Sequence, residues 1–387
     1  MRTVGGAAGA PGGVTQGGRT LGALRVALHV TLASTLACAS GGSAPATSAG
    51  PDPGNVERVN SPWPIATRMH VDLWLHGFAM LQSDTTLIPY FERGYSSSME
   101  AFKRRANVST QLDLNAEQLR ARMAINPSII NAQFLALQAS SLDNLLGAAE
   151  LFLRAEGVAS RSGDRATQLA IATFAQYFPT AADREWLRMF LIAIRDENDR
   201  FYRSYWLARQ QDLSPVLTRV DSLWESHVRP KLQGYLGNSR SGTGTMLLSL
   251  PLNGEGRTLT GSTRTNNLIA VGFPDSLSQV DEAFYVFAHE AILRIAQTAV
   301  DDNTTPVEKR DGLNDRYLSA AAVRGGLLLL ERTLPEMAAG YMRYYLLSAG
   351  RPVPATTVRD AFEQTFPLPQ QIFDAVESQL ASVMGGI

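Results

Sequence analysis

From residue 66 to about residue 237, nearly every segment of the chain repeats its apolar residues with the period of a helix. Strand candidates gather in one place, as short runs over 245–250, 257–260 and 267–272, and a helix that is apolar on all sides follows them. A helix of that kind has to be buried. The pattern therefore predicts an α+β fold that is predominantly α, with one small sheet beside a long buried helix.

Two domains are expected, a helical domain over 63–237 and a second domain with the sheet over 238–387. The helices are predicted over 71–81, 141–154, 183–210, 213–236, 276–301 and 316–334, with a helical tail over 335–387. Ser276 and Gln279 have the spacing of a capping box, which predicts the start of the buried helix.

The first 38 residues have the composition of an export signal. Arginines and small residues precede a mostly apolar run over 26–37, which is too short as a helix to cross a bilayer. Cys38 follows this run and is the only cysteine of the chain. The sequence before it resembles the lipobox of bacterial lipoproteins, with Thr35 where leucine is usual. The resemblance implies a lipoprotein signal over 1–38 with lipid on Cys38; the alternative is an ordinary signal with an incidental cysteine.

Residues 39–62 are rich in Gly, Ser, Ala, Thr and Pro, a composition typical of a flexible tether. We therefore expect a protein of the bacterial cell envelope, anchored by lipid to a membrane and facing the periplasm or the exterior. The formal net charge of −1 over 387 residues provides no basic footprint for nucleic acid. The expected partners are the membrane, through the lipid anchor, and a peptide or protein.

The candidate catalytic and metal-binding residues begin in the predicted buried helix over 276–301. His289 and Glu290 interrupt its apolar middle, and burying them is costly unless they are paired, hydrogen-bonded or metal-bound. The later helix has a similar pattern, because it is apolar over 320–330 apart from Arg324 and then reaches Glu331.

This arrangement resembles the zincin metallopeptidases, in particular the gluzincins. In that family a sheet with an exposed edge strand precedes a helix with the motif H-E-x-x-H, and a second helix supplies a glutamate as the third zinc ligand. The resemblance implies that His289 and Glu331 are metal ligands, with zinc as the cofactor. It also implies that Glu290 is the catalytic general base that activates water.

The motif departs from the family at its second histidine, which is Leu293 here. His289 and Glu331 are then two ligands where a catalytic zinc normally has three. The sequence therefore favours a degenerate, non-catalytic metallopeptidase homologue without a cofactor, in a binding or scaffold role. The alternative is an active zinc-dependent peptidase that uses His289, Glu290 and Glu331.

Arg294 lies four residues after Glu290, in the favourable order for a helical ion pair. It is predicted to be the charge partner of Glu290, or to reach Glu331, and so to replace a metal. Arg324 is a second possible partner for Glu331.

Other candidates carry less weight. Tyr341, Tyr344 and Tyr345 are either core aromatics or a source of an oxyanion donor. His70 and His76 lie six residues apart, on different faces of a helix, and make a poor ligand pair. Two charged runs are interpreted as surface: residues 195–200, as a solvated helix face, and residues 103–105.

Overall fold

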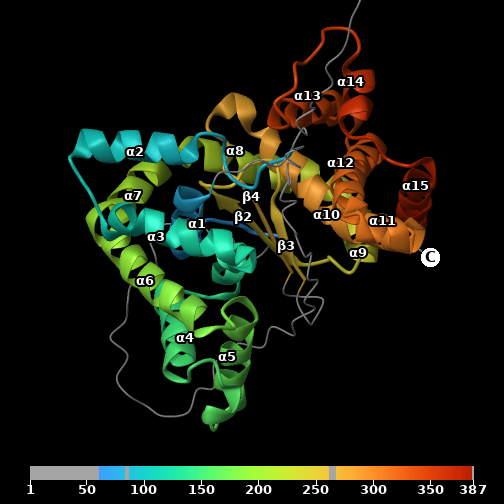
Figure 1. Ribbon diagram of the computed structural model, residues 1–387. Helices are drawn as coiled ribbons and strands as arrows, with labels where there is room; N and C mark the ends of the chain where they lie inside the picture. The colour runs from blue at the N-terminus through green and yellow to red at the C-terminus, as the bar shows by residue number, and fades with distance from the viewer. Residues whose placement is uncertain (1–60, 83–86, 261–266, 386–387) are drawn as a thin grey trace, which may run out of the picture.

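A central sheet lies between two groups of helices in the computed structural model, which describes residues 61–82, 87–260 and 267–385 (Figure 1). The described part of the chain is mostly helical with one four-stranded sheet, so the predicted fold class is confirmed. The predicted signal over 1–38, with Cys38, lies outside the described residues, as does the predicted tether up to residue 60.

The helices of the first group come from the first half of the chain. They are α1 (Met69–Leu81), α2 (Tyr95–Ala106), α3 (Gln111–Ile125), the 3₁₀ segment η1 (Pro127–Gln138), α4 (Leu142–Arg154), the 3₁₀ turn η2 (Ala159–Arg161), α5 (Arg165–Tyr177), α6 (Ala181–Glu197) and α7 (Arg203–Asp212). The π-helical turn η3 (Asn198–Tyr202) joins α6 to α7, so the predicted long helix over 183–210 is continuous but not regular.

The helices of the second group follow. They are α8 (Ser214–Leu223), the π-helical turn η4 (Trp224–Val228), α9 (Arg229–Asn238), the 3₁₀ turn η5 (Leu277–Gln279), α10 (Asp281–Asn303), α11 (Pro306–Arg310), α12 (Leu313–Thr333), the 3₁₀ turn η6 (Pro335–Met337), α13 (Ala338–Ser348), α14 (Val358–Thr365) and α15 (Gln370–Gly385). Within the described ranges, every helix is too short or too polar to span a bilayer.

The sheet has the strand order β1-β2-β4-β3. Its strands are β1 (Ile65–Ala66), β2 (Gly244–Ser249), β3 (Arg257–Leu259) and β4 (Asn267–Gly272). β1, β2 and β4 are parallel, whereas β3 runs antiparallel to β4 at the edge of the sheet. The three strands from the predicted region are therefore present, and β1 adds a short strand that the sequence pattern does not predict.

Alternate residues of the sheet enter two different cores. On β2, Met246 and Leu248 pack with the helices of the second group, whereas Leu247 packs with the first group. This follows from the period of two along a strand. The change of core falls near Leu213, earlier than the predicted domain boundary at residue 237, because the buried residues of α8 and α9 belong to the second core.

The start of the buried helix differs in detail from the prediction. α10 begins at Asp281 after the 3₁₀ turn, and the side chain of Ser276 caps no backbone N–H. Its hydroxyl instead donates to the side-chain oxygen of Gln279 at 2.8 Å. The two residues therefore interact, but they do not form the predicted capping box.

Candidate functional site

His289 and Glu290 lie in the middle of α10, the helix that packs against β4 and α12. Both residues are buried, at 2% and 3% exposure. Nδ1 of His289 lies 3.1 Å from Oε1 of Glu290, so the two neighbours interact with each other. The pairing offsets part of the cost of burying them.

Helices α12 and α13 fill the space around His289. The ring of Tyr345 stacks on the imidazole, with 5.6 Å between centroids and 28° between planes. Gly326 of α12 lies against α10. A Cβ at Gly326 would be 3.2 Å from Cα of His289 and would collide with the hydroxyl of Tyr341. The absence of a side chain at Gly326 therefore lets α12 approach α10 closely.

Glu290 faces the edge strand of the sheet. A Cβ on Gly256 would lie 2.9 Å from Cγ of Glu290, and the hydroxyl of Thr258 donates to the Glu290 carbonyl oxygen at 3.2 Å. The second carboxylate oxygen of Glu290, Oε2, is buried and has no hydrogen-bond partner among the described residues. An unpartnered buried oxygen of this kind is costly.

Glu331 is engaged elsewhere. The Glu331 carboxylate pairs with Arg359 of α14, and the Glu331 side chain is 29% exposed to solvent. Across residues 61–82, 87–260 and 267–385, no group of three or more His, Cys, Asp or Glu residues is placed to hold a metal ion. His289 and Glu290 supply one imidazole and one carboxylate, which do not fit the three protein ligands of a catalytic zinc.

The two candidate arginines have other surroundings than those predicted. Arg294 is exposed on α10, and no ion pair between it and Glu290 is found in the described part of the chain. Arg324 pairs with Glu363 at 3.3 Å and lies over the ring of Phe373. Arg324 therefore pairs with Glu363 rather than with Glu331, and Arg294 is exposed whereas Glu290 is buried.

Tyr341 and Tyr345 are core residues, Tyr344 is partly buried against the same core, and the hydroxyls of all three already have acceptors. Tyr341 donates to the carbonyl of Val323 at 2.8 Å, and Tyr345 donates to the carbonyl of Gly254 at 3.1 Å. Tyr344 donates to the side chain of Asn253 at 3.3 Å. Of the two interpretations drawn from the sequence, the core role therefore fits these contacts.

A second buried polar centre lies in the helices of the first group. Glu197 of α6 is fully buried and accepts hydrogen bonds from three side chains of α1, α2 and the start of α3. Its partners are Nε2 of His76 at 2.9 Å, Nζ of Lys103 at 2.7 Å and the hydroxyl of Thr110. This Glu197 network therefore ties four helices together.

The charges of the Glu197 network follow from its contacts. Burial alone would raise the pKa of Glu197, but the hydrogen bond from His76 and the charge of Lys103 outweigh it and lower that pKa to about 2. Burial lowers the pKa of His76. A neutral His76 that donates from Nε2 to Glu197 can accept the hydroxyl of Tyr95 at Nδ1, 3.0 Å away.

Two interpretations drawn from the sequence are wrong in part. Residues 195–200 are not simply a solvated helix face, because Glu197 is fully buried, and residues 103–105 are not all on the surface, because Lys103 is 3% exposed. Each charge is the partner of the other. Residues so far apart in the sequence give no local sign of such a pair.

Helix α1 holds a further buried acid that was not predicted from the sequence. Asp72 is fully buried and accepts hydrogen bonds from Nε1 of Trp206 at 2.8 Å and the hydroxyl of Ser249 at 2.6 Å. Burial raises its pKa to about 7, against the effect of these hydrogen bonds. The sequence pattern could have predicted this buried acid, because Asp72 and His76 interrupt an apolar helix just as His289 and Glu290 do. His70, by contrast, lies next to the carbonyl of Ala139, so the two histidines of α1 have separate partners.

Comparison of the chain with protein-family models, with curated proteins and with solved structures finds no match.

Proposed function

We propose that this chain is a cell-envelope lipoprotein with a zincin-like body that acts in binding or as a scaffold rather than as a peptidase. One observation carries the proposal for the body: Nδ1 of His289 is paired with the neighbouring Glu290, and Glu331 is paired with Arg359. Pairing of this kind offsets part of the cost of burying His289 and Glu290, and it occupies the Glu331 carboxylate, without a metal ion.

The arrangement around α10 supports the kinship with zincins. The sheet precedes α10 in the chain. Thr258 of its antiparallel edge strand β3 donates to the carbonyl oxygen of Glu290, and Gly256, just before β3, lies close to the Glu290 side chain. α12 packs against α10 and ends near Glu331, which is the order of elements that the resemblance implies. A second helix with a glutamate is thus present, but that glutamate has a different partner.

The membrane anchor is supported by the sequence alone. Cys38 follows a short apolar run and precedes a segment with the composition of a tether. A lipid at that position would hold the folded body near a membrane surface. We therefore place the body on the periplasmic or outer side of a bacterial membrane.

A second candidate function, an active zinc-dependent peptidase, is favoured by one observation. Oε2 of Glu290 is buried without a hydrogen-bond partner among the described residues, which is how the acceptor oxygen of a general base would be found before water is bound. In this alternative, His289 and Glu331 would be the metal ligands, and zinc would supply the Lewis acid.

Substitution of Glu290 distinguishes the non-catalytic binding protein from the active peptidase. We expect the intact protein and its Glu290→Gln variant to cleave a mixture of fluorescent peptides at the same background rate, with or without added zinc. A general base contributes about 10²–10⁴-fold to a rate, so if the protein were a peptidase, the loss of Glu290 would cause a large fall in the cleavage rate. The matched control is Arg294→Gln, at an exposed position of the same helix. Zinc-dependent cleavage that Glu290→Gln abolishes and Arg294→Gln retains would establish the peptidase instead.

A further inference from the structure

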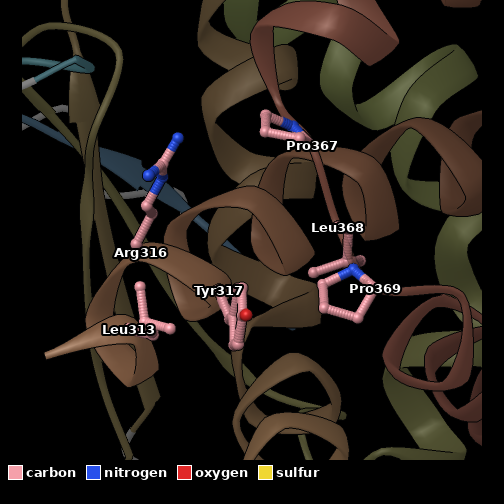
Figure 2. A pocket seen from close by; sticks show the side chains of 6 residues that line it. All are labelled: Leu313, Arg316, Tyr317, Pro367, Leu368 and Pro369. Carbon is pink, nitrogen blue, oxygen red and sulfur yellow. The ribbon is translucent and has the colours of Figure 1, made fainter. Parts of the chain in front are cut away.

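A hollow of about 360 Å³ opens between the start of α12 and the segment that joins α14 to α15 (Figure 2). We call it the α12 groove and define it by its lining residues Leu313, Arg316, Tyr317, Pro367, Leu368 and Pro369. Its volume is within the range of small-molecule sites, about 300–1,000 Å³. It lies apart from the His289–Glu290 pair, since none of its lining residues contacts that pair among the contacts found.

The walls of the groove are mostly apolar. Leu313 and Tyr317 are one helical turn apart and share a face of α12. The opposite wall is Pro367-Leu368-Pro369, in which the two prolines have no backbone N–H to donate. Walls of this kind suit an aliphatic chain better than a peptide backbone, which would need hydrogen-bond partners.

One of the residues that line the groove, Arg316, is charged. Arg316 is exposed, and no ion pair to its guanidinium is found within the described ranges. Glu308, the acid that contacts Tyr317, already accepts from the hydroxyl of Tyr317 at 3.3 Å and from the backbone N–H of Thr305 at 2.9 Å. Asp311 and Asp315 also lie close to Arg316 in the sequence, and no ion pair between them and Arg316 is found within the described ranges. α12 begins at Leu313, which lines the groove, and it has no side-chain cap there. The positive end of the dipole of α12 therefore lies at the groove, on the same side as Arg316.

We propose that the α12 groove binds a single-chain aliphatic carboxylate, with the carboxylate at Arg316 and the chain between Tyr317 and the Pro367–Pro369 wall. The apolar walls account for the chain and the unpaired cation accounts for the acidic head. The inference deepens the proposed binding role and rests on it, because it names the class of ligand that the body would hold.

The test compares three ligands that share one chain and differ in the charge of the head. Octanoate, 1-octanol and octylammonium are titrated into the intact protein, and binding is followed by calorimetry and by the methyl NMR signals of Leu313 and Leu368. We expect octanoate to bind tightest and octylammonium weakest. Arg316→Gln should weaken octanoate about fivefold, the size of an exposed ion pair, and leave 1-octanol unchanged. The control is Arg343→Gln, at an exposed position of α13.

A second variant keeps the test decisive. Leu368→Asp places a charge in the apolar wall and should abolish binding of all three ligands while the far-ultraviolet circular dichroism stays unchanged. Equal binding of the three ligands, or octanoate binding that ignores both Arg316→Gln and Leu368→Asp, would overturn the proposal. Octanoate binding together with Glu290-dependent peptide cleavage would overturn the non-catalytic function but retain the groove.

Discussion

Replacement of Glu197 by alanine should lower the free energy of unfolding by about 3–5 kcal/mol, because it leaves a buried charge without its partner. Lys103 would lose its fully buried carboxylate acceptor at 2.7 Å and would retain the half-buried Asp113 at 2.8 Å and the hydroxyl of Thr110 at 3.2 Å. His76 would lose the acceptor of its Nε2. Urea unfolding of the full chain, followed by tryptophan fluorescence, measures the change.

The control lies on the same helix. Glu185 is 63% exposed and pairs with Arg188 on the surface of α6, so Glu185→Ala should cost at most about 1 kcal/mol. The double variant Lys103→Met/Glu197→Leu should cost less than the sum of its single changes, because neither charge is then left alone. A loss below about 1 kcal/mol for Glu197→Ala would show that the network does not stabilise the fold as described.

The effect of Glu197→Ala should also depend on pH. The pKa of Glu197 is lowered from 4.5 to about 2 in the folded protein. Its contribution to stability is therefore present above the pKa of the unfolded chain and is lost as the pH falls towards the folded pKa. The difference between the wild type and Glu197→Ala should narrow below pH 4.5, the ordinary value of this carboxyl. A difference that stays constant down to about pH 3 would contradict an ionised Glu197.

Replacement of Cys38 by serine should move the protein almost entirely from the membrane pellet to the soluble fraction of a bacterial host. Each buried CH₂ of an acyl chain contributes about 0.8 kcal/mol to membrane binding, so loss of the chains removes the anchor. Among the described residues no helix could replace it as a span. Fractionation and incorporation of a labelled fatty acid measure the two consequences together.

Ser40→Ala is the matched control, since it changes a residue close to Cys38 and keeps the cysteine. This variant should remain labelled and membrane-bound. If Cys38→Ser fractionates like the wild type, or if the wild type takes up no fatty acid, the lipoprotein assignment is wrong.

The sequence predicts the fold class because that depends on local periodicity. The strand runs over 245–250 and 267–272 and the helix opened by Ser141 are found close to their predicted bounds, with the Ser141 hydroxyl accepting the N–H of Asn144 at 3.2 Å. Strand β1 was not predicted, because two residues have no periodicity of their own and become a strand only beside β2.

The candidate site is predictable only as far as neighbours in the sequence determine it. Burial of His289 and Glu290 follows from the apolar helix around them. The pairing of Glu331 with Arg359 depends on how α14 docks near α12, and that contact leaves no local pattern. Lys103 and Glu197 are 94 residues apart for the same reason. Charged runs were therefore assigned to the surface wherever the partner was distant.

The central claim is that His289 and Glu290 pair with each other and hold no catalytic metal. Its most direct test is the zinc content of the intact protein after equilibration with zinc and removal of unbound metal by gel filtration. His289→Ala tests the site, and His227→Ala is the control for a surface histidine, since His227 is 44% exposed beside Glu336.

We predict far less than one zinc per chain in the wild type, and the same small amount in both variants. Close to one zinc per chain, lost in His289→Ala and retained in His227→Ala, would contradict the account.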